Sequence, residues 1–132
     1  MSSLLIIDDD RTDRLLMRLA LLKRDTELDI IELAGGIGAV ELIKCCTPNA
    51  TILDIRMPGM DGFDVLRRIR SEPGLSAHTV IMVSGSEEPR DKSLAQEAGA
   101  DGFLTKPASL GQYGELADTI CEQVFGDREC TQ

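Results

Sequence analysis

Acidic, hydroxyl and amine side chains directly follow short apolar segments at four places in the sequence. The first of these segments ends in three aspartates, Asp8 to Asp10, and later segments end in Asp54, Ser84 and Lys106. Carboxylates that converge need a cation between them. Mg²⁺ binds a few carboxylates while keeping positions for phosphate oxygens. If the four places come together in the fold, these residue types predict a magnesium-dependent phosphoryl-transfer site.

Each of these side chains suits one role in phosphoryl transfer. Asp54 can act as the nucleophile and form an aspartyl phosphate, because carboxylates form such covalent intermediates. Asp8 and Asp9, together with Asp54, are expected to hold the Mg²⁺ ion, which offsets charge on the transferred group. Lys106 would place a point charge, and Ser84 a hydroxyl donor, against oxygens of that group.

The segments that carry these residues are typical of strands that alternate with helices. Strands are expected at residues 4–7, 28–33, 50–53, 79–83 and 102–105. The inner strands are continuous apolar runs, which predicts an α/β fold with a parallel sheet covered on both faces. The simplest arrangement for this length is a doubly wound five-stranded sheet in the order 2-1-3-4-5, with the second strand at an edge. Ligands of such sheets bind beyond the carboxyl ends of the strands, where the winding direction reverses.

Five amphipathic segments supply the helices. Their expected apolar faces are Leu15, Leu16, Leu19 and Leu22; Val40 and Ile43; Phe63, Leu66 and Ile69; Leu94, Ala95 and Ala98; and Leu110, Tyr113, Ala117, Ile120 and Val124. Asp10 is the expected N-cap of the first helix, with Asp13 in its first turn. The fourth helix has the smallest apolar face, so we expect it to be weakly anchored. His78, just before the fourth strand, is expected to be an exposed loop side chain on the rim opposite the site.

The composition indicates one acidic domain. The chain has 132 residues, 23 acidic and 14 basic side chains, and a net charge of −9. We expect one domain over residues 1–126, followed by a polar tail or the start of a linker at 127–132. The acidic balance argues against direct nucleic-acid binding, and neither a signal peptide nor an apolar run of the ~20 residues that span a membrane is present. A cytoplasmic protein with reduced thiols, including the adjacent Cys45 and Cys46, is therefore expected.

Four ordered motifs resemble the receiver domain of two-component response regulators. They are Ile6-Ile7-Asp8-Asp9, the segment from Leu53 to Gly62, Val83-Ser84-Gly85, and the segment from Gly99 to Pro107. The resemblance extends from Leu4 to about Val124; each motif alone is modest, and the ordered set is highly specific. It implies a flavodoxin-like fold and a phosphorylation-dependent signalling switch. Such a switch is not an enzyme for a separate substrate, since it phosphorylates and dephosphorylates only itself.

The resemblance also assigns the phosphoacceptor and the metal ligands. It implies that Asp54 accepts a phosphoryl group from a phosphohistidine on a sensor histidine kinase or a phosphotransfer protein. It further implies Mg²⁺ ligation by Asp9, Asp54 and the backbone carbonyl of Arg56, with Asp8 acting directly or through water.

A switch around the phosphoryl group is implied in the same way. Ser84, followed by Gly85, is expected to meet the phosphoryl group, and Phe103 to turn inward in response. Lys106-Pro107 is expected to be a cis peptide. The fourth helix, fifth strand and fifth helix would form the output surface for a downstream effector protein or for an effector domain outside this chain. A second copy of the chain is a further candidate partner.

Two other functions are compatible with parts of the sequence. Asp8 and Asp10 have the Asp-x-Asp spacing of Mg²⁺-dependent phosphohydrolases of the haloacid dehalogenase type, although Arg11-Thr12 stands where that motif has Gly-Thr. The other alternative is a docking module that works without phosphorylation. Loss of an acyl phosphate in Asp54→Asn would support the receiver, and its loss only in Asp8→Asn the hydrolase. Failure to bind Mg²⁺ or beryllofluoride would support the docking module.

Overall fold

Five parallel strands form one sheet in the order β2-β1-β3-β4-β5 in the computed structural model, which describes residues 2–85 and 88–126. The elements along the chain are β1 (Ser3–Ile7), α1 (Arg11–Arg24), β2 (Asp29–Leu33), α2 (Ala39–Cys46), β3 (Ala50–Asp54), α3 (Gly62–Ser71), β4 (Thr79–Ser84), α4 (Pro89–Ala98), β5 (Gly102–Thr105), a 3-10 helix (Leu110–Gln112) and α5 (Tyr113–Phe125). The doubly wound α/β fold and its strand order are as predicted. The expected tail at 127–132 lies outside the described residues.

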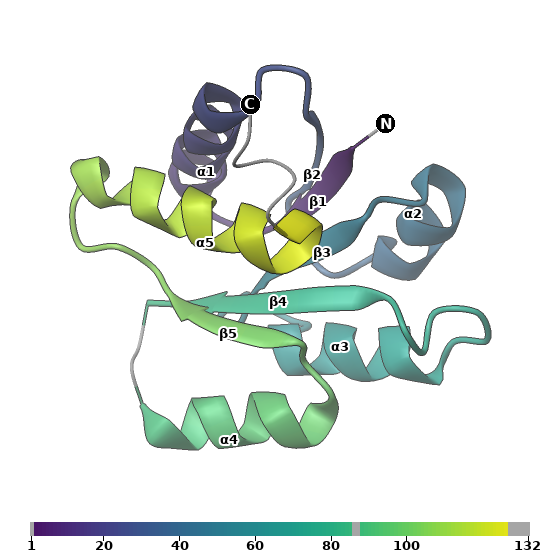
Figure 1. Cartoon of the computed structure of the whole chain (residues 1–132). Helices are drawn as coiled ribbons and strands as arrows, with labels where there is room; N and C mark the ends of the chain where they lie inside the picture. The colour runs from purple at the N-terminus through teal and green to yellow at the C-terminus, as the bar shows by residue number, and fades with distance from the viewer. Residues whose placement is uncertain (1, 86–87, 127–132) are drawn as a thin grey trace.

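The sheet lies between two layers of helices (Figure 1). An apolar core fills the space between the sheet and the helices on each of its faces. Successive strand residues point to opposite faces. Leu4 and Ile6 of β1 therefore pack with α1 and α5, whereas Leu5 and Ile7 pack with α2, α3 and α4. Burial on both faces explains why the inner strands are apolar throughout. No helix in the described part of the chain is long and apolar enough to cross a membrane.

The register of the central strands brings the predicted site residues together. Ile7 of β1 lies beside Leu53 of β3. The residues that follow them, Asp8 and Asp54, consequently stand next to each other at the carboxyl edge of the sheet. This edge is also where the winding direction reverses, between β1 and β3.

The buried face of α1 differs in part from the predicted one. Leu16 and Leu22 pack partly buried against the core as predicted, but Leu15 and Leu19 are about half exposed, and Met17 and Leu21 are buried instead. Residues 15–22 are almost all apolar, so the helical period in the sequence does not select one face. Contact with α5 and the sheet selects it instead.

The end of the chain also shows two differences from expectation. Leu110 precedes α5 in the 3-10 helix and is exposed, whereas Tyr113, Ala117 and Ile120 are buried as predicted. The peptide between Lys106 and Pro107 is trans, in contrast to the cis form implied by the family resemblance. The two isomers of an X-Pro bond differ by only about 0.5–1 kcal/mol, so a sequence motif alone does not determine which one forms.

α4 is only shallowly attached to the sheet. Of its residues, Asp91 and Ala95 are buried, and Leu94 and Ala98 are partly buried against the core. This agrees with the small apolar face expected from the sequence.

Candidate functional site

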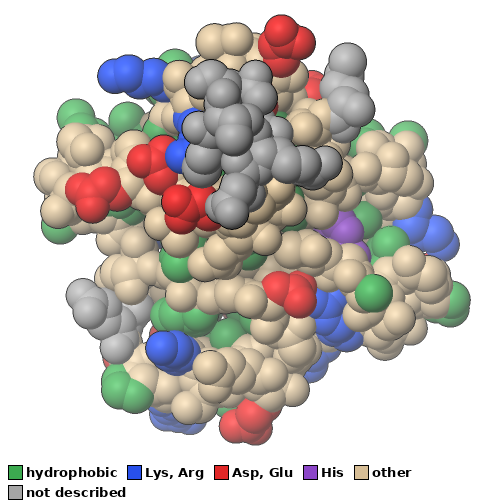
Figure 2. Space-filling view, viewed as in Figure 1, with side chains coloured by type: hydrophobic (Ala, Val, Ile, Leu, Met, Phe, Trp, Pro, Cys, Tyr) green, Lys and Arg blue, Asp and Glu red, His purple; other side chains and the backbone are tan. Residues whose placement is uncertain are grey.

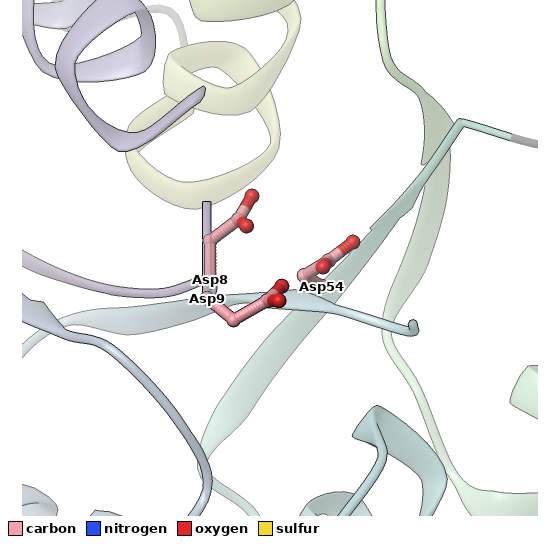
Figure 3. Close-up of side chains that lie close together, drawn as sticks. All are labelled: Asp8, Asp9 and Asp54. Atoms are coloured by element: carbon pink, nitrogen blue, oxygen red, sulfur yellow. The ribbon is translucent and has the colours of Figure 1, made fainter. Parts of the chain in front are cut away.

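Three carboxylates gather at the carboxyl edge of the sheet (Figure 3). Asp8 and Asp54 are each only 6% exposed, while Asp9 is exposed. Oxygen atoms from the three side chains all lie within 4.8 Å of one another. Three negative charges this close favour a bound cation, and carboxylate oxygens are the ligands that hard divalent ions prefer. The cluster is therefore compatible with a divalent metal ion.

Lys106 places its ammonium group inside this acidic cluster. Its Nζ lies 2.9 Å from Oδ2 of Asp8, 3.1 Å from Oδ1 of Asp54 and 2.8 Å from Oδ2 of Asp13. Its backbone N–H donates to the carbonyl of Ser84 at 2.7 Å, which holds the end of β5 beside the end of β4. The fold thus brings a cation to the strand ends that supply the carboxylates.

Burial and mutual repulsion change the acidity of the clustered groups. Burial, together with the nearby charge of Asp8, raises the pKa of Asp54 from 3.8 to about 6. Burial also raises the pKa of Asp8. For Lys106, burial lowers the pKa, but hydrogen bonds to Asp13 and Asp8 outweigh it and raise the pKa above its ordinary value. Lys106 is therefore fully charged, and Asp54 is mostly ionised at neutral pH.

The loop after β3 is shaped by a close contact with the start of α3. The backbone N–H of Gly62 donates to the carbonyl of Ile55 at 2.9 Å. A Cβ atom at Gly62 would overlap the carbonyl oxygen of Asp54 and approach the Cα of Ile55 at 2.9 Å. Asp61 and Asp64 form a capping box that starts α3 at this point. Glycine is therefore required for Asp54 to keep its position.

An open cleft of about 410 Å³ lies above the three carboxylates. It is lined by Asp8, Asp9, Asp10, Asp13, Asp54, Arg56, Gly85 and Lys106. Buried carboxylates, an ammonium group and an open approach are the parts that an aspartyl phosphoryl-transfer site needs.

Comparison with known proteins identifies the family of this chain. The family model described as the response regulator receiver domain matches residues 4–117. The chain belongs to this family. Among solved structures, the phosphorylated cyanobacterial phytochrome response regulator RcpA superposes with a TM-score of 0.85 at 23% identity, covering 94% of each chain, which supports the fold.

Two further relatives of this receiver domain are informative. The transcriptional regulatory protein AfsQ1 of Streptomyces coelicolor is 32% identical over 133 residues, which cover 99% of this chain and 55% of the relative. The chain thus spans about half the length of that protein. The Mn²⁺-bound form of the response regulator Rcp1 is 25% identical, covers 92% of this chain and 93% of that one, and has a TM-score of 0.80.

The receiver fold brings most, though not all, of the predicted site residues to the cleft. Ser84 ends β4 and is fully buried, outside the lining of the cleft. Phe103 packs, partly buried, against the core on the α2–α4 side of the sheet. Pro107 borders a different groove, beside α5. Asp10 lines the cleft, but its carboxylate caps α1 by accepting from the N–H groups of Thr12 and Asp13, and it is not part of the cluster formed by Asp8, Asp9 and Asp54.

The role of Asp13 at the site was missed by sequence reasoning. The sequence predicts Asp13 only as an acid that stabilises the first turn of α1. In the structure, Asp13 also contacts Lys106 and accepts a hydrogen bond from Tyr113. One signal was available: Asp13 stands four residues before Met17 and eight before Leu21. These three residues therefore share the core-facing side of the helix.

His78 also differs from expectation. It lies at the amino end of β4, on the predicted opposite rim, but it is half-buried and not exposed. Its Nε2 is 2.8 Å from the hydroxyl of Thr51, and its carbonyl accepts a hydrogen bond from Arg70. Burial and the charge of Arg70 lower its pKa.

Proposed function

We propose that this receiver domain is a phosphorylation-dependent switch of a two-component phosphorelay, with Asp54 as phosphoacceptor. The proposal depends above all on the position of Asp54, whose buried carboxylate lies 3.1 Å from the Lys106 ammonium and within a cluster with Asp8 and Asp9. The donor would be a phosphohistidine on a sensor histidine kinase or a phosphotransfer protein.

The proposed transfer is a single displacement at phosphorus. A carboxylate oxygen of Asp54 attacks, the phosphorus–nitrogen bond of the phosphohistidine breaks, and the imidazole keeps the electron pair and takes up a proton. Lys106 stabilises the negative charge of the phosphoryl oxygens, and Ser84 and Gly85 supply hydrogen-bond donors once the end of β4 adjusts. Loss of the phosphoryl group to water returns Asp54 to its free form. The chain acts on no separate substrate.

Mg²⁺ is the proposed cofactor. Asp8, Asp9, Asp54 and the backbone carbonyl of Arg56 would hold it, and Arg56 borders the same cleft. The ion would supply positive charge that offsets the charge on the phosphoryl oxygens. The Mn²⁺-bound form of the related Rcp1 supports a divalent ion in this family.

The proposed output surface consists of α4, β5 and α5. The shallow attachment of α4 makes it the element most readily repositioned by a small free energy. Figure 2 shows acidic side chains gathered over α5, whose exposed residues include Glu115, Asp118 and Glu122. Phe103 would turn inward as this surface changes.

The partner of this surface would be a downstream effector protein, an effector domain outside this chain, or a second copy of the chain. The greater length of the transcriptional regulatory relative supports an attached or separate effector. A partner with basic side chains suits the acidic surface of α5. As a partner of histidine kinases, the protein is proposed to act in the cytoplasm.

Phosphorylation with acetyl phosphate tests the acceptor. The wild-type chain should acquire one acyl phosphate in the presence of Mg²⁺, and Asp54→Asn should acquire none. The conservative variant Asp29→Asn, on β2 away from the site, should be labelled like the wild type. Labelling that persists in Asp54→Asn but disappears in Asp8→Asn would instead favour the phosphohydrolase.

Amide hydrogen exchange tests the output surface. Beryllofluoride with Mg²⁺ should change protection in α4, β5 and α5, and should leave β2 and α2 unchanged as internal controls. Unchanged protection in α4 and α5 despite bound beryllofluoride would refute this surface while leaving the acceptor in place.

A further inference from the structure

Lys106 has a partner that takes no part in the proposed phosphoryl transfer. Its Nζ lies 2.8 Å from Asp13, compared with 2.9 Å from Asp8 and 3.1 Å from Asp54. Asp13 stands in the first turn of α1, where its backbone N–H donates to the carboxylate of Asp10. The side chains of Lys106 and Asp13 are 15% and 27% exposed, so their interaction is less screened than that of a surface ion pair.

We propose that Asp13 is a positioning residue that holds the Lys106 ammonium between phosphorylation events and competes with the phosphoryl group for it. The inference rests on the proposed function. Once Asp54 carries a phosphoryl group, an oxygen of that group is the strongest acceptor near Lys106. Asp8 is then engaged with the divalent ion. Asp13 is therefore the carboxylate that opposes the move of Lys106 toward the phosphoryl group.

Tyr113 connects this exchange to α5. Its hydroxyl donates to Oδ1 of Asp13 at 3.4 Å, and the side chain is buried at the start of the helix. When Lys106 turns to a phosphoryl oxygen, Asp13 loses its cation and the Tyr113 hydroxyl remains beside it as a donor. The phosphorylation state would thus change the contacts of the first turn of α5. Tyr113 is the only tyrosine in a chain without tryptophan, so its fluorescence reports on this position.

A purely structural role for Asp13 predicts a different outcome. If Asp13 serves only as an acid that stabilises the N-terminus of α1, its removal lowers stability and weakens the binding of Mg²⁺ and of beryllofluoride in parallel. If Asp13 competes for Lys106, removal of its charge makes the anion beryllofluoride bind more tightly and the cation Mg²⁺ bind more weakly. The opposite signs distinguish the two roles.

The test compares Asp13→Asn with Asp10→Asn in the full chain. Both variants lose one negative charge at the start of α1, and asparagine still serves as an N-cap at position 10. Only the first variant loses the contact with Lys106. Calorimetry would measure Mg²⁺ binding and then beryllofluoride binding at saturating Mg²⁺. The decay of the acyl phosphate formed from acetyl phosphate, and the Tyr113 fluorescence, would be followed in parallel.

Asp13→Asn should bind beryllofluoride about three- to tenfold more tightly, keep its acyl phosphate longer by a similar factor, and bind Mg²⁺ about threefold more weakly. Asp10→Asn should change beryllofluoride affinity by less than about twofold, because the ion pairs of Lys106 are with Asp8, Asp13 and Asp54, and an asparagine oxygen still accepts from the N–H groups of Thr12 and Asp13. Asp13→Glu, which keeps the charge, should lie closer to the wild type than Asp13→Asn does.

Equal beryllofluoride affinity in Asp13→Asn and Asp10→Asn would overturn the proposal. A parallel weakening of both ligands in Asp13→Asn would also overturn it and leave the structural role. A wild-type chain that binds no beryllofluoride would overturn the proposed function and this inference with it. Binding by the wild type with no difference between the variants would overturn this inference alone.

Discussion

The guanidinium of Arg56 lies 2.7 Å from the carboxylate of Asp91 and joins the loop after Asp54 to the first turn of α4. The two partners differ in environment: the side chain of Asp91 is 4% exposed and that of Arg56 is 62% exposed. A buried carboxylate is therefore paired with a cation that reaches it from the surface. Because so little of α4 is buried, this ion pair is a substantial part of the attachment of α4 near Asp54.

Arg56→Met should destabilise the protein by about 1–3 kcal/mol, because it leaves the Asp91 charge buried without its cation. Urea unfolding without metal would measure the loss. Arg67→Met is the matched control: Arg67 is 60% exposed, but its partner Asp64, 3.4 Å away, is 49% exposed. That pair is expected to contribute less than about 0.5 kcal/mol. Equal losses in the two variants would show that the burial of Asp91 has no energetic consequence.

Gly62→Ala should displace the backbone at Asp54. The added Cβ would overlap the Asp54 carbonyl oxygen and press on Ile55, so we expect a loss of about 1–3 kcal/mol and slower labelling by acetyl phosphate. Gly114→Ala is the control, since a Cβ there meets nothing within 4 Å in the first turn of α5. It should raise stability by up to about 1 kcal/mol. Thermal unfolding and labelling rates would separate the two, and normal labelling in Gly62→Ala would contradict the steric argument.

The sequence predicted the fold and the centre of the site because both depend on strand ends. Strands buried on both faces are apolar throughout, so the residue where each run stops is visible in the sequence. In a parallel sheet those strand ends meet at one edge, so the sequence alone predicts that Asp8, Asp54 and Lys106 lie together, as they do in the structure.

Features that depend on which side of an element is covered were less predictable. Nearly every position in the middle of α1 is apolar, so only packing against α5 distinguishes buried Met17 from half-exposed Leu19. The contact of Asp13 with Lys106 was not predictable either, because it joins residues 93 positions apart in the sequence. The sequence predicts an exposed His78 because nothing in the neighbouring residues indicates its hydrogen bond to Thr51 on the adjacent strand.

Asp54→Asn should stabilise the metal-free protein at neutral pH. Since the folded-state pKa of Asp54 is raised to about 6, the folded chain binds this proton more tightly than the unfolded chain does. The contribution of Asp54 to stability is therefore full below about pH 4 and is lost as pH rises through about 6. In EDTA the variant should gain about 1–3 kcal/mol over the wild type at about pH 7.5 and little at about pH 4. Asp29→Asn, at an exposed position, controls for net charge, and a gain independent of pH would contradict the prediction.

His78 should affect stability with the opposite dependence on pH. Burial, then the charge of Arg70, lowers its pKa below the ordinary 6.5, so the folded state favours the neutral imidazole. Its contribution is present above about pH 6.5 and is lost as pH falls through the folded-state pKa. Because Asp54 titrates in the same range with the other sign, the contribution of His78 is best obtained as the difference between the wild type and His78→Gln in EDTA. This is the only histidine in the chain, so one set of imidazole NMR signals gives its pKa directly. Arg70→Met should raise that pKa without restoring 6.5, because burial remains, and a wild-type value at or above 6.5 would contradict the buried, neutral imidazole beside Thr51.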